Sequence, residues 1–124
     1  DQGRTEYMYA PLPSPLVDPA VVAKDFELEN LTPSGEIYSI GPQPSKLVVP
    51  LITAPTLLVL AERDLLFPIE YADVEFSLFH GAVDRDLLVV PGAGHSFMLH
   101  RNAPETFDAV GNWLSEQAAS HPAC

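Results

Sequence analysis

The sequence has little positive charge, a single cysteine and no long apolar run. Only 6 of its 124 residues are lysine or arginine, against 17 acidic residues, and the formal net charge is −11 at pH 7. Nucleic acids and anionic membranes bind basic surfaces, so this charge argues against both as partners. The one cysteine, Cys124, excludes a disulfide within the chain and a cysteine-rich metal site. No run reaches the roughly 18 apolar residues of a membrane span, and no secretory signal pattern opens the sequence.

The composition is that of a globular protein, with 47% hydrophobic and 19% charged residues. A chain of 124 residues forms one domain at most and buries a modest core. Most of the 13 prolines precede Pro55, so the two parts of the chain differ in character. We expect residues 1–46 to form a proline-rich connector with a helical segment, and residues 47–124 to form an α/β unit.

Two apolar runs predict buried β-strands. The first covers Thr56–Ala61 and the second covers Leu87–Val90. Both runs are nearly continuously apolar, as in strands of a parallel sheet that is covered on both faces. Such strands need neighbouring strands, so the pattern predicts pairing partners that this chain does not contain.

Three helices are predicted, over residues 19–28, over residues 68–79 and from residue 103 onward. The type of a short amphipathic piece over residues 36–40 stays open. The residues expected to cap the three helices are Asp18, Gly81 and Asn102. The last helix carries an apolar stripe that we expect to face the core: Phe107, Val110, Trp113 and Leu114.

The order strand, helix, strand, helix predicts an α/β fold, with a parallel sheet and helices packed on its faces. The carboxyl ends of the strands form the edge where such sheets bind ligands. Each predicted strand delivers one titratable residue to this edge, Asp64 after the first and His95 after the second. Because neighbouring strands lie about 5 Å apart, we expect these two side chains to meet.

An aspartate next to a histidine is the acid–base part of a hydrolytic triad. The carboxylate fixes the tautomer of the imidazole and stabilises the imidazolium that forms when histidine takes a proton. Histidine is the usual general base near neutral pH. Two simpler interpretations stay open: Asp64 caps the helix that follows it, and His95 is bonded to a loop carbonyl. The occurrence of both residues at one sheet edge favours the pair.

The stretches around these residues resemble the C-terminal part of α/β-hydrolase-fold enzymes. The segment APTLLVLAERDLLFP resembles the acid-bearing strand and turn of that family, and LLVVPGAGHSFMLHRNAPETFDAVGNWL resembles its histidine loop and final helix. The resemblance covers about Val49 to Leu114. It implies that Asp64 is the triad acid, that His95 is the triad histidine, and that no cofactor or metal is needed. It also implies that the chain is the C-terminal half of such a fold, completed by another chain or segment, with residues 1–46 loosely resembling the end of a cap.

The nucleophile elbow of that family, G-x-S-x-G, is absent from this sequence. Ser34 has a glycine on one side only, and Ser96 adjoins His95 and should face away from it. We therefore expect the serine on an N-terminal half of the same hydrolase, on a separate chain that arises by precursor cleavage or is lost during handling. The start at Asp1 suggests the same. The substrate would be a small acyl compound, an ester, thioester or amide. The aspartate nucleophile of haloalkane and epoxide chemistry would also lie upstream and stays open.

Other polar and aromatic residues receive weaker interpretations. Asp84 and Asp86 precede the second strand and should lie at the opposite sheet edge. The remaining histidines, His80, His100 and His121, have no metal-ligand spacing. Three apolar residues beside the acid and the histidine could line an acyl pocket or simply pack beneath the loops: Phe67, Phe97 and Met98.

The alternative to a hydrolase is a non-catalytic interaction or dimerisation module. Unpaired strand edges recruit other chains. An α/β remnant of this size would then pair through its sheet edges and would perform no chemistry.

Overall fold

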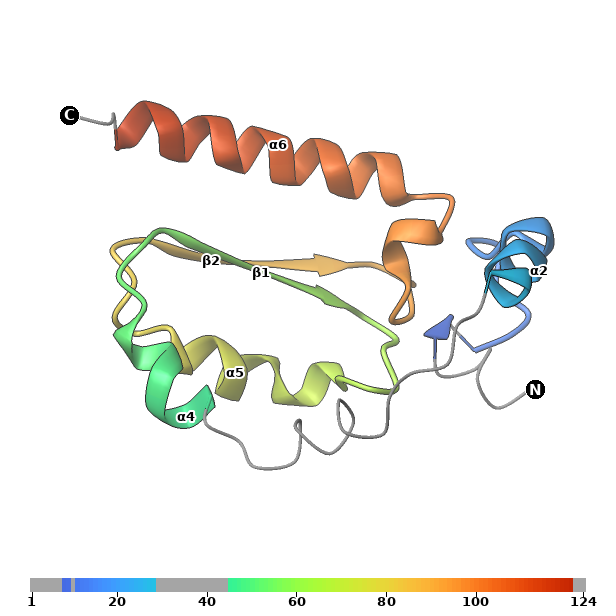
Figure 1. Ribbon diagram of the computed structural model, residues 1–124, viewed down its shortest axis with the longest axis horizontal. Helices are drawn as coiled ribbons and strands as arrows, with labels where there is room; N and C mark the ends of the chain where they lie inside the picture. Colours follow the sequence, from blue (N-terminus) through green and yellow to red (C-terminus); the bar gives the residue numbers. More distant parts are fainter. Residues whose placement is uncertain (1–7, 10, 29–44, 122–124) are drawn as a thin grey trace.

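The computed structural model describes residues 8–9, 11–28 and 45–121 (Figure 1). The predicted piece over residues 36–40, together with Ser34 and Cys124, lies outside these described residues. No helix in the described part is long and apolar enough to cross a membrane. In chain order the elements are helices α2 (Pro19–Glu27) and α4 (Ser45–Val48), 3₁₀ helix η1 (Val49–Leu51), strand β1 (Thr56–Ala61), 3₁₀ helix η2 (Ile69–Tyr71), helix α5 (Ala72–Leu78), strand β2 (Arg85–Val90), 3₁₀ helix η3 (Phe97–Leu99) and helix α6 (Ala103–Ser120).

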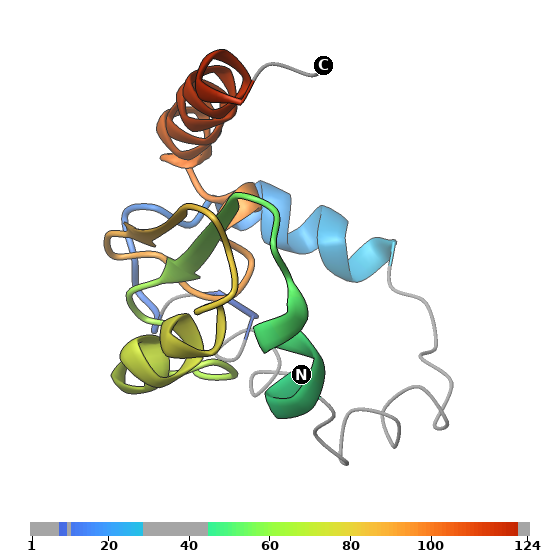
Figure 2. The ribbon, with the colours of Figure 1, turned by 90° about the vertical axis from the view of Figure 1, so that its left-hand side faces the viewer.

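The described strands form a parallel two-stranded sheet. Their register runs from Thr56 opposite Arg85 to Ala61 opposite Val90, so the two strands end level with each other. Helix α6 lies over one face and α5 over the other, which makes three layers (Figure 2). The chain is thus a mixed α/β structure with a small parallel sheet, as the order of elements predicts.

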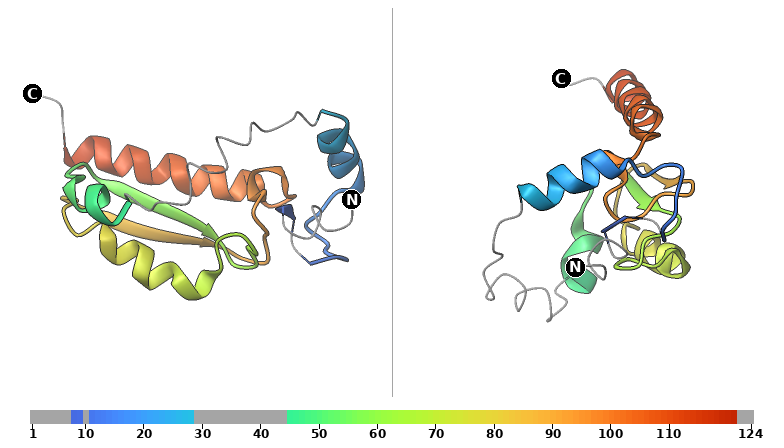
Figure 3. Two further views of the ribbon diagram at one scale, coloured as in Figure 1. Left: turned by 60° about the horizontal axis from the view of Figure 1, so that its bottom comes forward. Right: turned by 90° about the vertical axis from the view of Figure 1, so that its right-hand side faces the viewer.

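Helix α2 lies beyond the carboxyl ends of the strands (Figure 3). Asp18 and Pro19 begin it as predicted, because Asp18 Oδ1 accepts a hydrogen bond of 2.9 Å from the backbone N–H of Ala20. The helix ends at Glu27, close to the expected boundary. Its position places this N-terminal helix at the carboxyl edge of the sheet.

The best-packed part of the molecule lies at the carboxyl ends of the strands. Ala61, Val90 and Ala93 form a buried cluster, and Val59 and Phe97 pack against it. Elsewhere the apolar residues of β1 and β2 are mostly half-buried. The buried cluster therefore holds the two loops that follow the strands. The amino ends of the strands are less well packed.

One capping prediction is wrong, and a second is confirmed in its position but not in its capping bond. Helix α5 ends at Leu78 with Phe79 in the capping position, and Gly81 has no positive φ. Gly81 is needed for space, because a Cβ there would lie 2.2 Å from the carbonyl oxygen of Pro50. Asn102 occupies the N-cap position of α6 without a capping bond, and its side-chain amide donates instead to the carbonyl of Pro91 at 3.2 Å.

Two boundaries and one face also differ from expectation. Strand β2 begins at Arg85, two residues before the apolar run, because backbone pairing with β1 extends over these exposed residues. The helix predicted over residues 68–79 is divided into η2 and α5. Phe107 and Leu114 are 57% and 56% exposed and do not belong to the core, because the buried positions of α6 are Ala103 and Thr106.

Candidate active site

The loops after the two strands run side by side. The N–H of Glu62 donates to the carbonyl of Val90 at 3.0 Å, which continues the ladder one residue past β1. The N–H of Arg63 then donates to the carbonyl of Ala93 at 2.8 Å. Since the strands end level and the loops remain bonded, Asp64 and His95 arrive at the same place.

Asp64 is buried and accepts three hydrogen bonds. Its Oδ1 accepts from the backbone N–H groups of Leu66 at 2.8 Å and Phe67 at 3.1 Å. Its Oδ2 lies 2.9 Å from Nδ1 of His95. The side chain is 7% exposed. Asp64 thus caps the turn that follows β1 and contacts the histidine with its second oxygen. It does not cap the helix that follows, because η2 begins at Ile69 after Pro68 with no side-chain capping bond.

His95 faces Asp64 with Nδ1, and this contact assigns its tautomer. A carboxylate oxygen is the acceptor in this contact, so Nδ1 is the donor, and in the neutral ring Nε2 then keeps its lone pair. The His95 side chain is 30% exposed, which leaves the ring within reach of a substrate. An imidazole oriented in this way can accept a proton at Nε2, and a neighbouring carboxylate stabilises the protonated form.

Two contacts shape the loop Gly92–Gly94 that precedes His95. Gly92 has φ of +68°, a conformation that side chains disfavour, and Leu16 lies 3.1 Å from where its Cβ would be. The N–H of Gly92 donates to Oε2 of Glu62 at 2.6 Å. The second strand's loop is therefore tied to the residue that follows the first strand.

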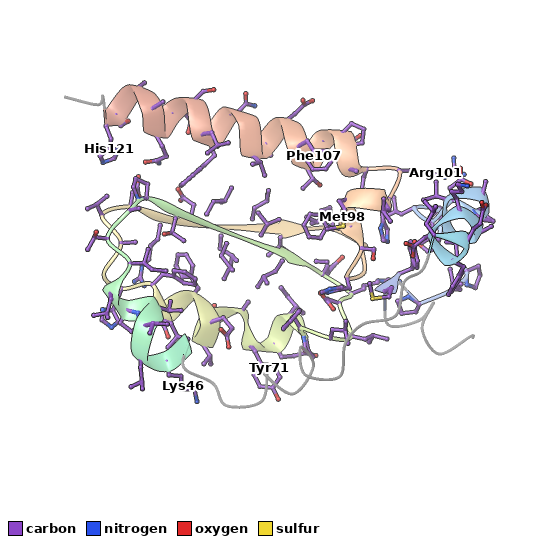
Figure 4. All side chains as sticks on the ribbon, viewed as in Figure 1. Lys46, Tyr71, Met98, Arg101, Phe107 and His121 are labelled. Carbon is purple, nitrogen blue, oxygen red and sulfur yellow. The ribbon has the colours of Figure 1, made fainter. Side chains whose placement is uncertain are left out.

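The three pocket candidates occupy different environments, and Figure 4 labels one of them, Met98. Phe67 is 60% exposed, and its ring centroid lies 5.4 Å from that of His95. Phe97 packs against the buried cluster, while Met98 is about half exposed on η3. Phe67 also lines a cavity of about 490 Å³ together with Leu60 and Tyr71. The structure thus brings Phe67 to the histidine and places Phe97 in the packing beneath the loop.

The competing acids lie at the opposite end of the sheet, as their place before β2 predicts. Asp84 accepts a hydrogen bond of 3.0 Å from the side chain of Gln117, and Asp86 accepts one of 2.7 Å from the indole N–H of Trp113. Both bonds attach α6 to the start of β2. Among the residues that the structure describes, no group of three histidine, cysteine, aspartate or glutamate side chains could hold a metal ion.

Two residues around the histidine loop make contacts that the sequence pattern did not indicate. Ser96 is buried, and its backbone N–H donates to the carbonyl of Met8. His100 is also buried and bonds to the backbone on both sides of His95. The spacing of His100 to His95 gave no signal, because these bonds go to main-chain groups.

No protein-family model and no curated protein matches this chain.

Proposed function

We propose that this chain supplies the acid and the general-base histidine of a hydrolase of the α/β-hydrolase type that its sequence resembles. The reaction would cleave an ester, thioester or amide, or transfer the acyl group to another acceptor. The observation that carries this proposal is the 2.9 Å contact between Asp64 Oδ2 and His95 Nδ1, with Asp64 Oδ1 held by two backbone N–H groups. An acid anchored on one oxygen and bonded to histidine on the other is the arrangement that orients a catalytic base.

The chemistry needs a serine nucleophile, which we place on another chain because this sequence has no G-x-S-x-G elbow. In the proposed reaction, a serine from an N-terminal half on a separate chain attacks the acyl carbon while His95 Nε2 takes the hydroxyl proton. His95 then gives that proton to the leaving group as the acyl-enzyme forms. Water attacks the acyl-enzyme, its proton passes to His95, and serine leaves with the proton restored. Asp64 stays ionised and holds the ring throughout.

The exposed apolar surface beside β1 supports the proposal that a second polypeptide segment completes the site. In the described residues β1 is paired on one edge only, by β2. The cavity lined by Phe67, Leu60 and Tyr71 opens beside β1 and α5. Phe67 and Tyr71 line the same cavity and are each about 60% exposed, and a contiguous exposed apolar patch is typical of an interaction site. A nucleophile-bearing segment that paired with β1 would cover this surface and arrive next to His95.

The test begins with an intact-mass spectrum of the native protein, followed by labelling with a fluorophosphonate, which reacts with activated serines. We expect a companion polypeptide and a label on one of its serines. His95→Ala should abolish labelling, and Asp64→Asn should lower kcat by roughly 10⁴-fold, because the amide N–H₂ turned toward Nδ1 favours the wrong tautomer. Asp84→Asn is the matched control, and it should leave turnover unchanged. Unchanged turnover in both Asp64→Asn and His95→Ala would remove the pair from the mechanism.

The dimerisation module is the second candidate, and the exposure of Phe107 and Leu114 on α6 favours it. It predicts that the 124-residue chain associates with itself and needs no companion chain. Sedimentation equilibrium on the purified chain separates the two functions. A folded homodimer without a companion and without fluorophosphonate labelling would favour the module over the hydrolase.

A further inference from the structure

A second histidine, His100, bonds to the main chain on both sides of His95. It follows η3 and is 4% exposed. Its Nδ1 lies 2.9 Å from the carbonyl oxygen of Ser96, and the N–H of Gly94 donates to its Nε2 at 3.3 Å. The imidazole thus connects the residue before His95 with the residue after it.

These two bonds require one protonation state of the His100 ring. A backbone N–H can only donate, so Nε2 must keep its lone pair, and a carbonyl can only accept, so Nδ1 must carry the hydrogen. Only the neutral Nδ1–H tautomer makes both bonds. The imidazolium and the other tautomer each place a hydrogen at Nε2, where it would face the N–H of Gly94.

The N-terminal segment keeps this ring in place. The Tyr9 ring stacks on His100 with a centroid separation of 5.9 Å and an interplanar angle of 29°. Tyr9 is 1% exposed, and its hydroxyl donates to Asp25 Oδ2 at 2.9 Å. The N–H of Ser96 bonds to the carbonyl of Met8. The ring is therefore enclosed between the histidine loop and a segment more than 80 residues away in sequence.

We infer that His100 is a positioning residue for His95. The loop before His95 contains Gly92 and Gly94, which lose more backbone freedom on ordering than other residues do. His100 supplies two bonds that fix this backbone, so that Nδ1 of His95 reaches Asp64 Oδ2 and Nε2 stays available. The inference rests on the proposed function only in taking His95 as the base.

The first measurement uses the unmodified 124-residue chain with ¹⁵N-labelled histidine. Long-range ¹H–¹⁵N NMR assigns the tautomer of each ring at a pH where the rings are neutral. We expect the Nδ1–H tautomer for both His95 and His100. An Nε2–H tautomer at His100 would overturn the inference without any variant.

The second measurement removes the two bonds. His100→Phe keeps a ring to stack on Tyr9 but has no polar atom, and His80→Phe is the matched control, because His80 is exposed after α5. In His100→Phe we expect His95 to lose its Nδ1-bound proton signal and to populate the Nε2–H tautomer. His100→Asn, whose amide nitrogen can replace Nδ1 as the donor to Ser96, should restore part of the signal. A folded His100→Phe chain with an unchanged His95 spectrum would refute the positioning role. If His100→Phe does not fold, the test rests on folded His100→Asn, and the absence of the Nδ1-bound proton signal of His95 in that variant would refute the role.

These spectra need no substrate, so they separate this inference from the proposed function. If the tautomer of His95 depends on His100 but His95→Ala leaves the turnover of the assembled protein unchanged, the positioning role stands and the proposed hydrolase function is refuted. If His95→Ala abolishes turnover while His100→Phe leaves the tautomer unchanged, the reverse holds. Where both stand, His100→Phe should lower kcat at least tenfold with little change in KM, because the ring acts on the base and does not touch substrate.

Discussion

The two oxygens of Asp64 have different partners, and substitutions that remove one or both sets of bonds should change the free energy of unfolding by different amounts. Oδ1 accepts from the N–H groups of Leu66 and Phe67, while Oδ2 bonds to His95. Asp64→Ala removes all three hydrogen bonds. Asp64→Asn keeps one oxygen, which can still accept from the two N–H groups, and replaces the other by an amide that faces Nδ1 of His95.

The expected magnitudes follow from these contacts. A hydrogen bond to a charged group contributes about 1.5–3 kcal/mol when both partners are buried. Leu66 and Phe67 are 45% and 60% exposed, so water replaces part of each lost bond. We therefore expect Asp64→Ala to lower the free energy of unfolding by about 2 kcal/mol, from about 1 kcal/mol for each backbone bond. Asp64→Asn keeps these bonds and should cost less than about 1 kcal/mol.

Urea unfolding of the 124-residue chain, followed by circular dichroism, measures both values. With a slope of about 2 kcal/mol per molar urea, Asp64→Ala should shift the midpoint down by about 1 M. Asp108→Ala, on the exposed side of α6, is the control and should change stability by less than about 0.5 kcal/mol. If Asp64→Asn destabilises as much as Asp64→Ala, the backbone bonds are not what Asp64 contributes to the fold.

Three glycines give further predictions, all measured by the same unfolding assay. Gly81→Ala should destabilise by about 2 kcal/mol or more, because the new Cβ would lie 2.2 Å from the carbonyl oxygen of Pro50 and 2.9 Å from that of Ile52, both backbone atoms. Gly111→Ala should instead stabilise by about 0.5–1 kcal/mol, since Gly111 is inside α6 with nothing within 4 Å of its Cβ position; equal effects at the two positions would contradict the packing at Gly81. Gly92→Ala should cost roughly 1–2 kcal/mol because φ is +68° there, and a neutral result would show that the histidine loop adopts another backbone.

Elements with a local chemical signal were predictable from the sequence. Asp18 and Pro19 mark the start of α2 because a side-chain oxygen and a fixed φ act within one helical turn. The apolar run Thr56–Ala61 coincides with β1 because burial selects the residues of a strand directly. The start of β2 was missed because Arg85 and Asp86 join the sheet through their backbones, and the side chains carry no trace of that pairing.

In the candidate site too, some features could be predicted from the sequence and others could not. The meeting of Asp64 and His95 follows from topology, since both residues come after parallel strands at one edge of the sheet. The contribution of His100 could not be predicted, because it depends on a ring whose two nitrogens bond to main-chain groups of a loop. The different surroundings of Phe67 and Phe97 also depend on packing across the loops. Because each residue closely follows the acid or the histidine in sequence, the sequence could not show which one is exposed and which one is packed.

Asp64 and His95 both belong to this chain and contact each other within it. Binding of a second chain and orientation of His95 can therefore be tested separately. Several contacts that hold Asp64 and the histidine loop come from residues that follow β1 or β2: the two backbone bonds to Asp64, the bond between Glu62 and Gly92, and the two bonds of His100. In the proposed hydrolase, a serine-bearing segment would thus meet a base that is already oriented, and its binding energy need not order the loop. Substitutions on the exposed surface around Tyr71 should then weaken assembly without changing the tautomer of His95, whereas substitutions at Asp64 should change the tautomer and leave assembly intact.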